Sequence, residues 1–244
     1  VYITFNVPAD QAAGTYTGTL KVTYDGAQAS VPVTLGVNDI LVSQTTHTQS
    51  KFNVTFAHWL GELNSTQDML DSYISVMAEH RISPGLIMCG NDSNHNDESI
   101  AAYAQKAYDL LQANPKMSTF AVPTPTMTDS STGLPTLNGE IFGKYLNAIV
   151  DVALASYDAK TQTGFDLMSY AICTVSIIDE PDLNNTLNRV PGVAAQFEGA
   201  ISGAKAYLET QAAAKGVSDA FVQEIETSLD NFPLIVSLTT TWTP

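Results

Sequence analysis

From Ile40 onward, short apolar segments alternate with long segments whose apolar residues recur at helical spacing, and this alternation most constrains the fold. The predicted strands are 52–56, 85–88, 118–122, 168–178 and 234–238. The predicted helices are 66–80 (capped by Ser65), 98–113, 139–157 and 193–229, the last broken near Gly216. Repeated strand–helix units favour a parallel sheet with right-handed crossovers. About five such units predict an α/β fold of the (β/α)8 TIM-type barrel class, incomplete in this chain.

Residues 1–37 instead alternate with a period of two, as antiparallel strands do. Strands are predicted at 1–5, 14–24 and 29–37, and Asp25-Gly26 predicts a hairpin turn because glycine adopts positive φ without cost. Three strands cannot close a sandwich. We therefore expect residues 1–40 to be the C-terminal part of a β-sandwich and residues 41–244 the first part of a barrel catalytic domain. Because incomplete domains expose unpaired strand edges, we expect the native protein to be longer at both ends, or to pair with the missing remainder of the barrel.

The composition excludes several classes of function. Acidic residues number 25 against 10 lysines and arginines, and a net charge of −15 argues against nucleic-acid binding and against anionic membrane surfaces. Apolar runs fall far short of the ~20 residues that a membrane span needs. An acidic chain poor in lysine and rich in Thr, Ser, Asn and Ala is typical of a secreted, cell-surface or periplasmic bacterial protein.

The cysteine count and the motifs point away from metals and cofactors. Cys89 and Cys173 are the two cysteines, too few for a disulfide framework or a cysteine zinc site, and we expect both to be inert core thiols. The sequence contains no Gly-rich phosphate loop, no serine nucleophile elbow and no His-x-x-x-His pair. We therefore expect neither a metal ion nor a cofactor.

Two adjacent acids, Asp179 and Glu180, directly follow the apolar run 171–178 and precede Pro181. The run is typical of a strand buried on both faces, and proline ends the ladder because it has no N–H to donate. The pair would then lie at the carboxyl end of a buried strand, where parallel sheets and barrels place their active sites. The alternative is an acid-capped helix N-terminus, and the residues alone leave both interpretations open.

Aromatic residues follow two other predicted strands. His58 and Trp59 follow the first strand, and Trp242 follows the fifth, so all three are candidates for binding a substrate at the carboxyl face. An indole face packs well on the apolar side of a pyranose, although packing against a lid or between domains is the favoured interpretation for Trp59.

Further polar residues lie near the ends of predicted helices and strands. His95 belongs to a polar group after the second strand that could bind hydroxyls, although a solvated turn is the favoured interpretation. His80 and Arg81 end a helix and are expected at the face of the barrel opposite the acids. The Pro/Thr/Ser-rich segment 126–136 is expected to be a loop that lines a pocket rim.

Three motifs in the same order resemble glycoside hydrolase family 123 and its relatives. They are Gly14-Thr15-Tyr16-Thr17-Gly18-Thr19-Leu20 with Val31-Pro32-Val33-Thr34-Leu35-Gly36-Val37, then Glu79-His80-Arg81-Ile82-Ser83-Pro84, then Ile178-Asp179-Glu180-Pro181. The resemblance spans most of the chain and implies a β-sandwich followed by a catalytic barrel with an Asp-Glu-Pro motif. The chain departs from the pattern at Ala13, where the family commonly has proline.

The resemblance implies a retaining exo-β-N-acetylgalactosaminidase that acts on glycans with a terminal 2-acetamido sugar. Glu180 would be the general acid, and Asp179 would hydrogen-bond the acetamido N–H so that the sugar's own carbonyl oxygen attacks the anomeric carbon. Such substrate-assisted enzymes are exceptions to the rule of two separated carboxylates. Two alternatives stay open: a glycosidase for a different sugar, and a non-catalytic carbohydrate-binding or structural surface module.

Overall fold

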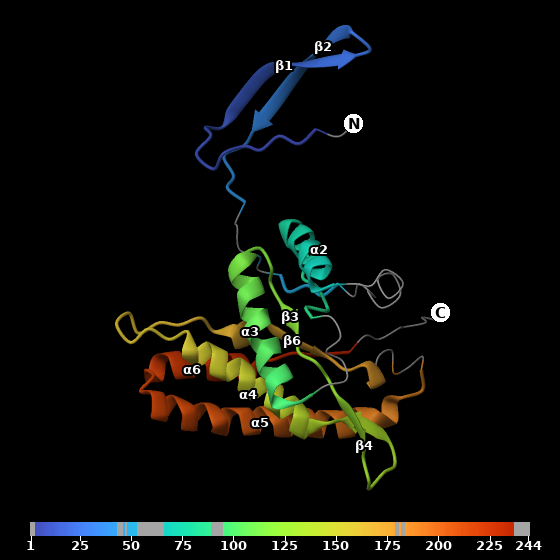
Figure 1. The fold of residues 1–244 in the computed structure, drawn as a ribbon, viewed down its shortest axis with the longest axis vertical. Coiled ribbons are helices and arrows are strands. Elements are labelled where there is room, and N and C mark those ends of the chain that lie inside the picture. The colour runs from blue at the N-terminus through green and yellow to red at the C-terminus, as the bar shows by residue number, and fades with distance from the viewer. Residues whose placement is uncertain are drawn as a thin grey trace. The chain divides into compact units, whose positions relative to one another are not determined.

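The structure, a computed structural model, describes residues 3–42, 46, 48–52, 66–88, 95–178, 181 and 184–236. These residues form a mixed α/β protein (Figure 1). The chain divides into two compact units, Val1–Gln44 and Thr45–Pro244, which we call the N-terminal and C-terminal units. The division lies within a few residues of the boundary predicted after residue 40.

The described part of the N-terminal unit, residues 3–42, contains one antiparallel hairpin. Strands β1 (Gly14–Tyr24) and β2 (Ala27–Val37) pair without a bulge from Gly14 opposite Val37 to Tyr24 opposite Ala27. Asp25 (φ 48°) and Gly26 (φ 79°) form the turn, and two successive positive φ angles match the right-handed twist of the flanking strands. The predicted hairpin is therefore confirmed.

The strand predicted at 1–5 is wrong for the part that the structure describes. Ile3 and Phe5 lie outside any strand and are half exposed, at 49% and 51%. Alternation identifies two faces of a segment but does not provide the neighbouring edge with which it must pair. In residues 3–42 the hairpin is the sheet that forms, and the β-sandwich stays a prediction.

The C-terminal unit is built on a short parallel sheet. Strands β3 (Phe120–Ala121), β6 (Ala171–Thr174) and β7 (Leu234–Ile235) lie side by side in chain order, with β6 in the centre. A separate parallel bridge joins Phe52 to Pro84, in the region of the first two predicted strands. The described segments do not close a barrel, so the (β/α)8 barrel stays a prediction.

The described residues of this unit form five α-helices, which confirm the predicted helical segments. They are α2 (Gln67–Glu79), α3 (Asp97–Ala113), α4 (Gly139–Ala155), α5 (Val190–Lys215) and α6 (Asp219–Asp230). The predicted break falls where Gly216 adopts φ 64° and ends α5. Thr66, one residue after the predicted cap, accepts a hydrogen bond of 3.3 Å from the Met69 amide and caps α2. In the part of the chain that is described, no helix has the length and apolar character needed to cross a membrane.

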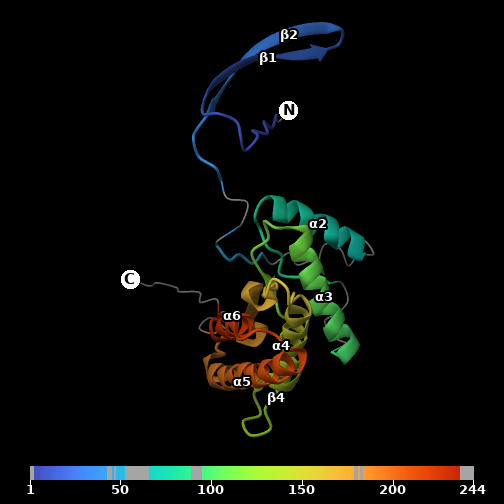
Figure 2. The same ribbon diagram turned by 90° about the vertical axis from the view of Figure 1, so that its left-hand side faces the viewer.

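Helices α4, α5 and α6 pack through an aromatic cluster. Helices α4 and α5 run side by side (Figures 1 and 2), and α6 packs on α5. Phe142 of α4, Phe197 of α5 and Phe232 after α6 stack with ring centroids 5.4–6.2 Å apart. Burial of these rings supplies much of the apolar area that holds the three helices together.

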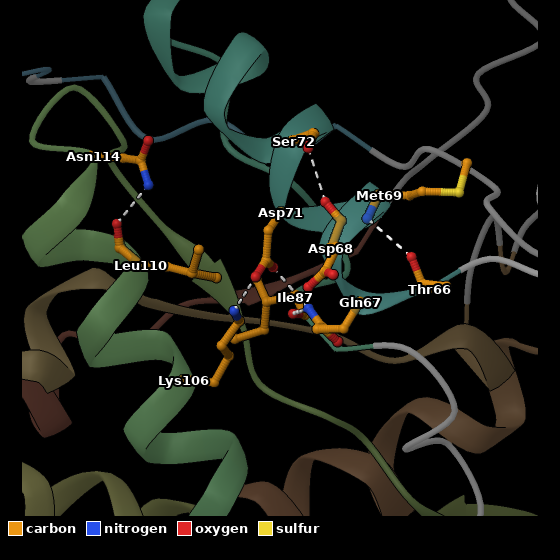
Figure 3. Close-up of polar contacts among 10 residues, drawn as sticks. All are labelled: Thr66, Gln67, Asp68, Met69, Asp71, Ser72, Ile87, Lys106, Leu110 and Asn114. Carbon is orange, nitrogen blue, oxygen red and sulfur yellow. Dashed lines mark hydrogen bonds and ion pairs between the residues drawn. The ribbon is translucent and has the colours of Figure 1, made fainter.

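Helix α2 is joined to α3 by the polar network in Figure 3. Lys106 Nζ of α3 lies 2.5 Å from Asp71 Oδ2 of α2, and Gln67 Nε2 donates to Asp71 Oδ1 at 2.8 Å. The same Gln67 amide donates to the Ile87 carbonyl at 3.0 Å. One network therefore ties α2 both to α3 and to the segment that follows α2.

Several predicted strands are shorter than expected or absent. The segment 168–178 forms the 3₁₀ helix Leu167–Tyr170, then β6, then the 3₁₀ helix Ser176–Ile178. Residues 85–88 form no strand, and 118–122 contributes only β3. These predictions failed because an uninterrupted apolar run indicates that a segment is buried. It does not distinguish a buried strand from a buried helical turn.

The segment predicted as a loop at 126–136 is instead an antiparallel hairpin. Its strands are β4 (Thr126–Thr128) and β5 (Pro135–Leu137). Asp129 accepts hydrogen bonds from Ser131 and Thr132 at its turn, so local polar contacts order a segment whose composition indicated a loop.

The helix-end motif at 79–84 has a structural role. Arg81 adopts φ 61° and ends α2 in a left-handed conformation. The fully buried Ser83 hydroxyl accepts hydrogen bonds from the amides of Ser118 (3.0 Å) and Thr119 (3.1 Å). The motif therefore fixes the chain after α2 against the amino end of β3.

Candidate functional site

A pocket of about 330 Å³ opens at the carboxyl ends of β3 and β6. Ala121 and Val122 line it from β3 and the residue after it, and Thr174 and Ser176 line it from the end of β6 and just beyond. Its volume is at the lower end of the range typical of small-molecule sites, which suits a ligand of monosaccharide size.

Hydrogen bonds between the two strand ends form the floor of the pocket. The Val122 amide donates to the Ile172 carbonyl at 2.8 Å, and Thr124 Oγ1 donates to the Thr174 carbonyl at 3.1 Å. Lys51 Nζ donates to Thr174 Oγ1 from the segment next to the Phe52 bridge. The floor thus joins three segments that are far apart in the sequence.

One wall of the pocket combines aromatic and polar groups. Tyr103 of α3 lines the pocket, and its hydroxyl donates to the Ala121 carbonyl. His95, which also lines the pocket, has Nδ1 3.1 Å from the hydroxyl of Tyr145 on α4. The wall therefore presents an imidazole held from behind by a buried tyrosine.

The charge in the pocket comes from a cation. Among the described lining residues, Lys51 carries a full charge and no carboxylate is present.

Cys173 lies beside this floor and is fully buried. Burial raises the pKa of its thiol to about 12, although the charge of Lys51 acts in the opposite direction. The prediction of a core thiol is thus confirmed for Cys173, and its inertness stays a prediction, while Cys89 lies outside the described residues. The described part of the chain contains no group of three or more potential metal ligands.

The residues proposed from the sequence as catalytic or substrate-binding are Asp179, Glu180, His58, Trp59 and Trp242. All five lie outside the described residues, so their placement stays a prediction. The described chain does lead toward the acid pair. Ser176 lines the pocket three residues before Asp179, and Ile178, the residue directly before it, is fully buried.

The structure adds pocket residues that the sequence analysis missed or undervalued. His95 is half-buried and lines the pocket, and the interpretation that it binds hydroxyls stays a prediction. Tyr103 has the same helical spacing as the apolar residues of α3, so the sequence indicates a core residue at this position. Lys51 directly precedes a predicted strand and belongs to no motif, so the sequence does not indicate that it lines a pocket. Pro125 lines the pocket, but the 126–136 hairpin does not.

A second hollow of about 570 Å³ lies between α4 and α5. Much of its lining consists of small residues, including Gly143, Gly199 and Gly203. It lies away from the carboxyl ends of the strands, and we attribute it to the short side chains along this helix contact.

Comparisons of the chain with protein-family models, with curated proteins and with solved structures found no match. Inference about function therefore depends on the pocket and on the residues that lead to it.

Proposed function

We propose that the C-terminal unit is the catalytic part of a glycoside hydrolase that binds a terminal 2-acetamido sugar in this pocket. The observation that carries the proposal is the position of the pocket at the carboxyl ends of β3 and β6, with Ser176 in its lining three residues before Asp179-Glu180. Parallel α/β sheets build their active sites at this edge, because the loops that follow the strands converge there.

The lining supports a sugar as the ligand. His95, Thr124 and Ser176 offer side-chain donors and acceptors that match ring hydroxyls. Leu86 and other apolar neighbours supply surface for the C–H groups of a pyranose. Apolar surface combined with directed polar groups is how small-molecule sites fix the orientation of a ligand.

The proposed reaction uses the two acids in separate roles. Glu180 gives its proton to the glycosidic oxygen as the bond to the anomeric carbon breaks, and the acetamido carbonyl oxygen bonds to that carbon. Asp179 accepts the acetamido N–H and stabilises the positive oxazolinium electrostatically. Water then attacks the anomeric carbon and gives its proton to the Glu180 carboxylate as the bond from that carbon to the acetamido oxygen breaks. This step restores the acetamido group, and two successive inversions retain the β configuration.

Aryl 2-acetamido-2-deoxy-β-galactosides and -glucosides provide the test. We expect the wild-type protein to release the aryl group, Glu180→Gln to lose at least about 100-fold in kcat/KM, and Asp179→Asn to lose turnover of these substrates. Glu198→Gln, an exposed position on α5, is the matched control and should retain wild-type rates. A thiazoline that mimics the oxazolinium should inhibit.

Wild-type protein without activity on either sugar would refute this assignment. Hydrolysis of sugars without an acetamido group, unaffected by Asp179→Asn, would retain the glycosidase and reject the role of Asp179.

A further inference from the structure

We propose that His95 binds a substrate hydroxyl in the pocket and that the buried Tyr145 hydroxyl positions its imidazole for this task. The inference rests on the proposed function for the identity of the ligand as a sugar. Its physical basis is a set of contacts that fixes one ring nitrogen and leaves the other for a ligand.

The imidazole is held by two different contacts with Tyr145. Nδ1 lies 3.1 Å from the tyrosine hydroxyl, and the two rings meet edge to face with centroids 5.9 Å apart and planes at 79°. Tyr145 is fully buried, so it cannot swing away from this position without opening the core. The ring of His95 is therefore oriented from the protein side.

The backbone directly after His95 is also anchored. Asn96 caps α3 by accepting a hydrogen bond of 2.8 Å from the Ser99 amide, which fixes where the helix begins directly after His95. Asp97, the first residue of α3, pairs with Lys144 of α4 at 3.1 Å. Consecutive residues of α4, Lys144 and Tyr145, thus hold the start of α3 in place.

Tyr103 extends this arrangement to the strand end. Its ring meets that of Tyr145 edge to face, with centroids 5.6 Å apart and planes at 90°. Its hydroxyl donates to the carbonyl of Ala121, which itself lines the pocket. The wall that carries His95 is therefore braced against the end of β3.

The two ring nitrogens of His95 have different roles in the proposed binding of a sugar hydroxyl. Within the described part of the chain, Nδ1 is the ring nitrogen of His95 that is hydrogen-bonded, and Nε2 is left for a ligand. A sugar hydroxyl can donate and accept, so it satisfies Nε2 in either tautomer. If Tyr145 fixes one tautomer of His95, that tautomer decides whether Nε2 donates the hydrogen bond to the sugar hydroxyl or accepts it.

The test combines kinetics with imidazole ¹⁵N NMR of the whole chain. His95→Gln and Tyr145→Phe are the variants; His80→Gln, exposed at the end of α2, and Tyr207→Phe, which bonds Asp151 on α4, are the matched controls. We expect Tyr145→Phe to raise KM about 3- to 10-fold with a smaller change in kcat. The same variant should convert the His95 signals from one tautomer to a mixture, and phenylalanine retains the ring contacts. Methyl 2-acetamido-2-deoxy-β-galactoside should shift the His95 Nε2 signal in wild-type protein.

The outcomes separate this inference from the proposed function. Hydrolysis with unchanged KM in both variants and an unmoved His95 signal would overturn the role of His95 while leaving the hydrolase intact. A His95 shift with sugar in wild-type protein, but without hydrolysis, would support the binding role and reject the enzyme. Neither a shift nor hydrolysis would reject both.

Discussion

The hydroxyl of Thr124 donates a hydrogen bond of 3.1 Å to the backbone carbonyl of Thr174, across the carboxyl ends of β3 and β6. β3 contains two residues and β6 four, so the backbone ladder between them is short. Its last bond runs from the Val122 amide to Ile172. Thr124 therefore continues the pairing by a side chain, at the point where the strands separate to form the pocket floor.

Replacing Thr124 with valine should weaken this floor. The variant removes the donor and leaves the Thr174 carbonyl with one partner fewer, which costs about 1 kcal/mol of unfolding free energy. Thr124→Ser retains the hydroxyl and serves as the control. Urea unfolding measures both, and equal stability of Thr124→Val and wild type would show that the bond contributes nothing.

Two glycines should respond to alanine in opposite directions. A Cβ at Gly164 would lie 2.5 Å from the ring of Phe221, which is 1% exposed and stacked on Tyr157, so the ring cannot move aside cheaply. Gly164→Ala should destabilise by about 1–3 kcal/mol. At Gly199, within α5, a Cβ meets nothing within 4 Å, and alanine should stabilise by about 0.5–1 kcal/mol. Thermal and urea unfolding of the two variants compare them, and a shift of the same sign in both would contradict the prediction.

The carboxyl group of Asp166 should give stability an unusual pH dependence. Asp166 is 6% exposed, and burial raises its pKa above 3.8, although hydrogen bonds from Ser228, Ser169 and Met168 oppose the shift. The native state then binds this proton more tightly than the unfolded state. The contribution of Asp166 to the free energy of unfolding is therefore greatest below 3.8 and falls as the pH rises through the native pKa.

Asp166→Asn tests this dependence, because asparagine can accept from the two amides and donate to Ser228 while it lacks the titration. In urea unfolding, the free energy of unfolding of Asp166→Asn relative to that of wild type should increase from pH 4 to pH 7. Asp166→Ala loses all three bonds and also lacks the titration, so its destabilisation relative to wild type should be about 2 kcal/mol at pH 4 and should become smaller as the pH rises. A difference between asparagine variant and wild type that is constant with pH would contradict the assigned pKa direction.

Cys173 should not react in the native protein. A fully buried thiol with a pKa of about 12 has almost no thiolate at pH 8, and thiolate is the reactive species. In a Cys89→Ser background, labelling with a thiol-specific disulfide reagent should proceed only as the protein unfolds, at a rate that urea increases. Rapid labelling of folded protein would show that the strand end is open to solvent.

The helices could be predicted from the sequence because local signals define them. Apolar residues such as Leu70, Ile74 and Ala78 recur on one face of α2, and Gly216 marks the end of α5. The Asp25-Gly26 turn likewise follows from local backbone preferences. The strands were harder to predict, because whether an apolar run becomes a strand or a 3₁₀ turn depends on an available partner edge, as 168–178 shows.

The sequence by itself determined the alternation of segments, the helix boundaries within a few residues, and the acid pair Asp179-Glu180 as a candidate for chemistry. Only the tertiary structure decided that Lys51, His95 and Thr124 surround one pocket with Thr174. These residues come from separate segments, and no local pattern relates them. Their proximity results from parallel pairing of β3 with β6 and from the packing of α3 on α4, which are long-range contacts that periodicity does not encode.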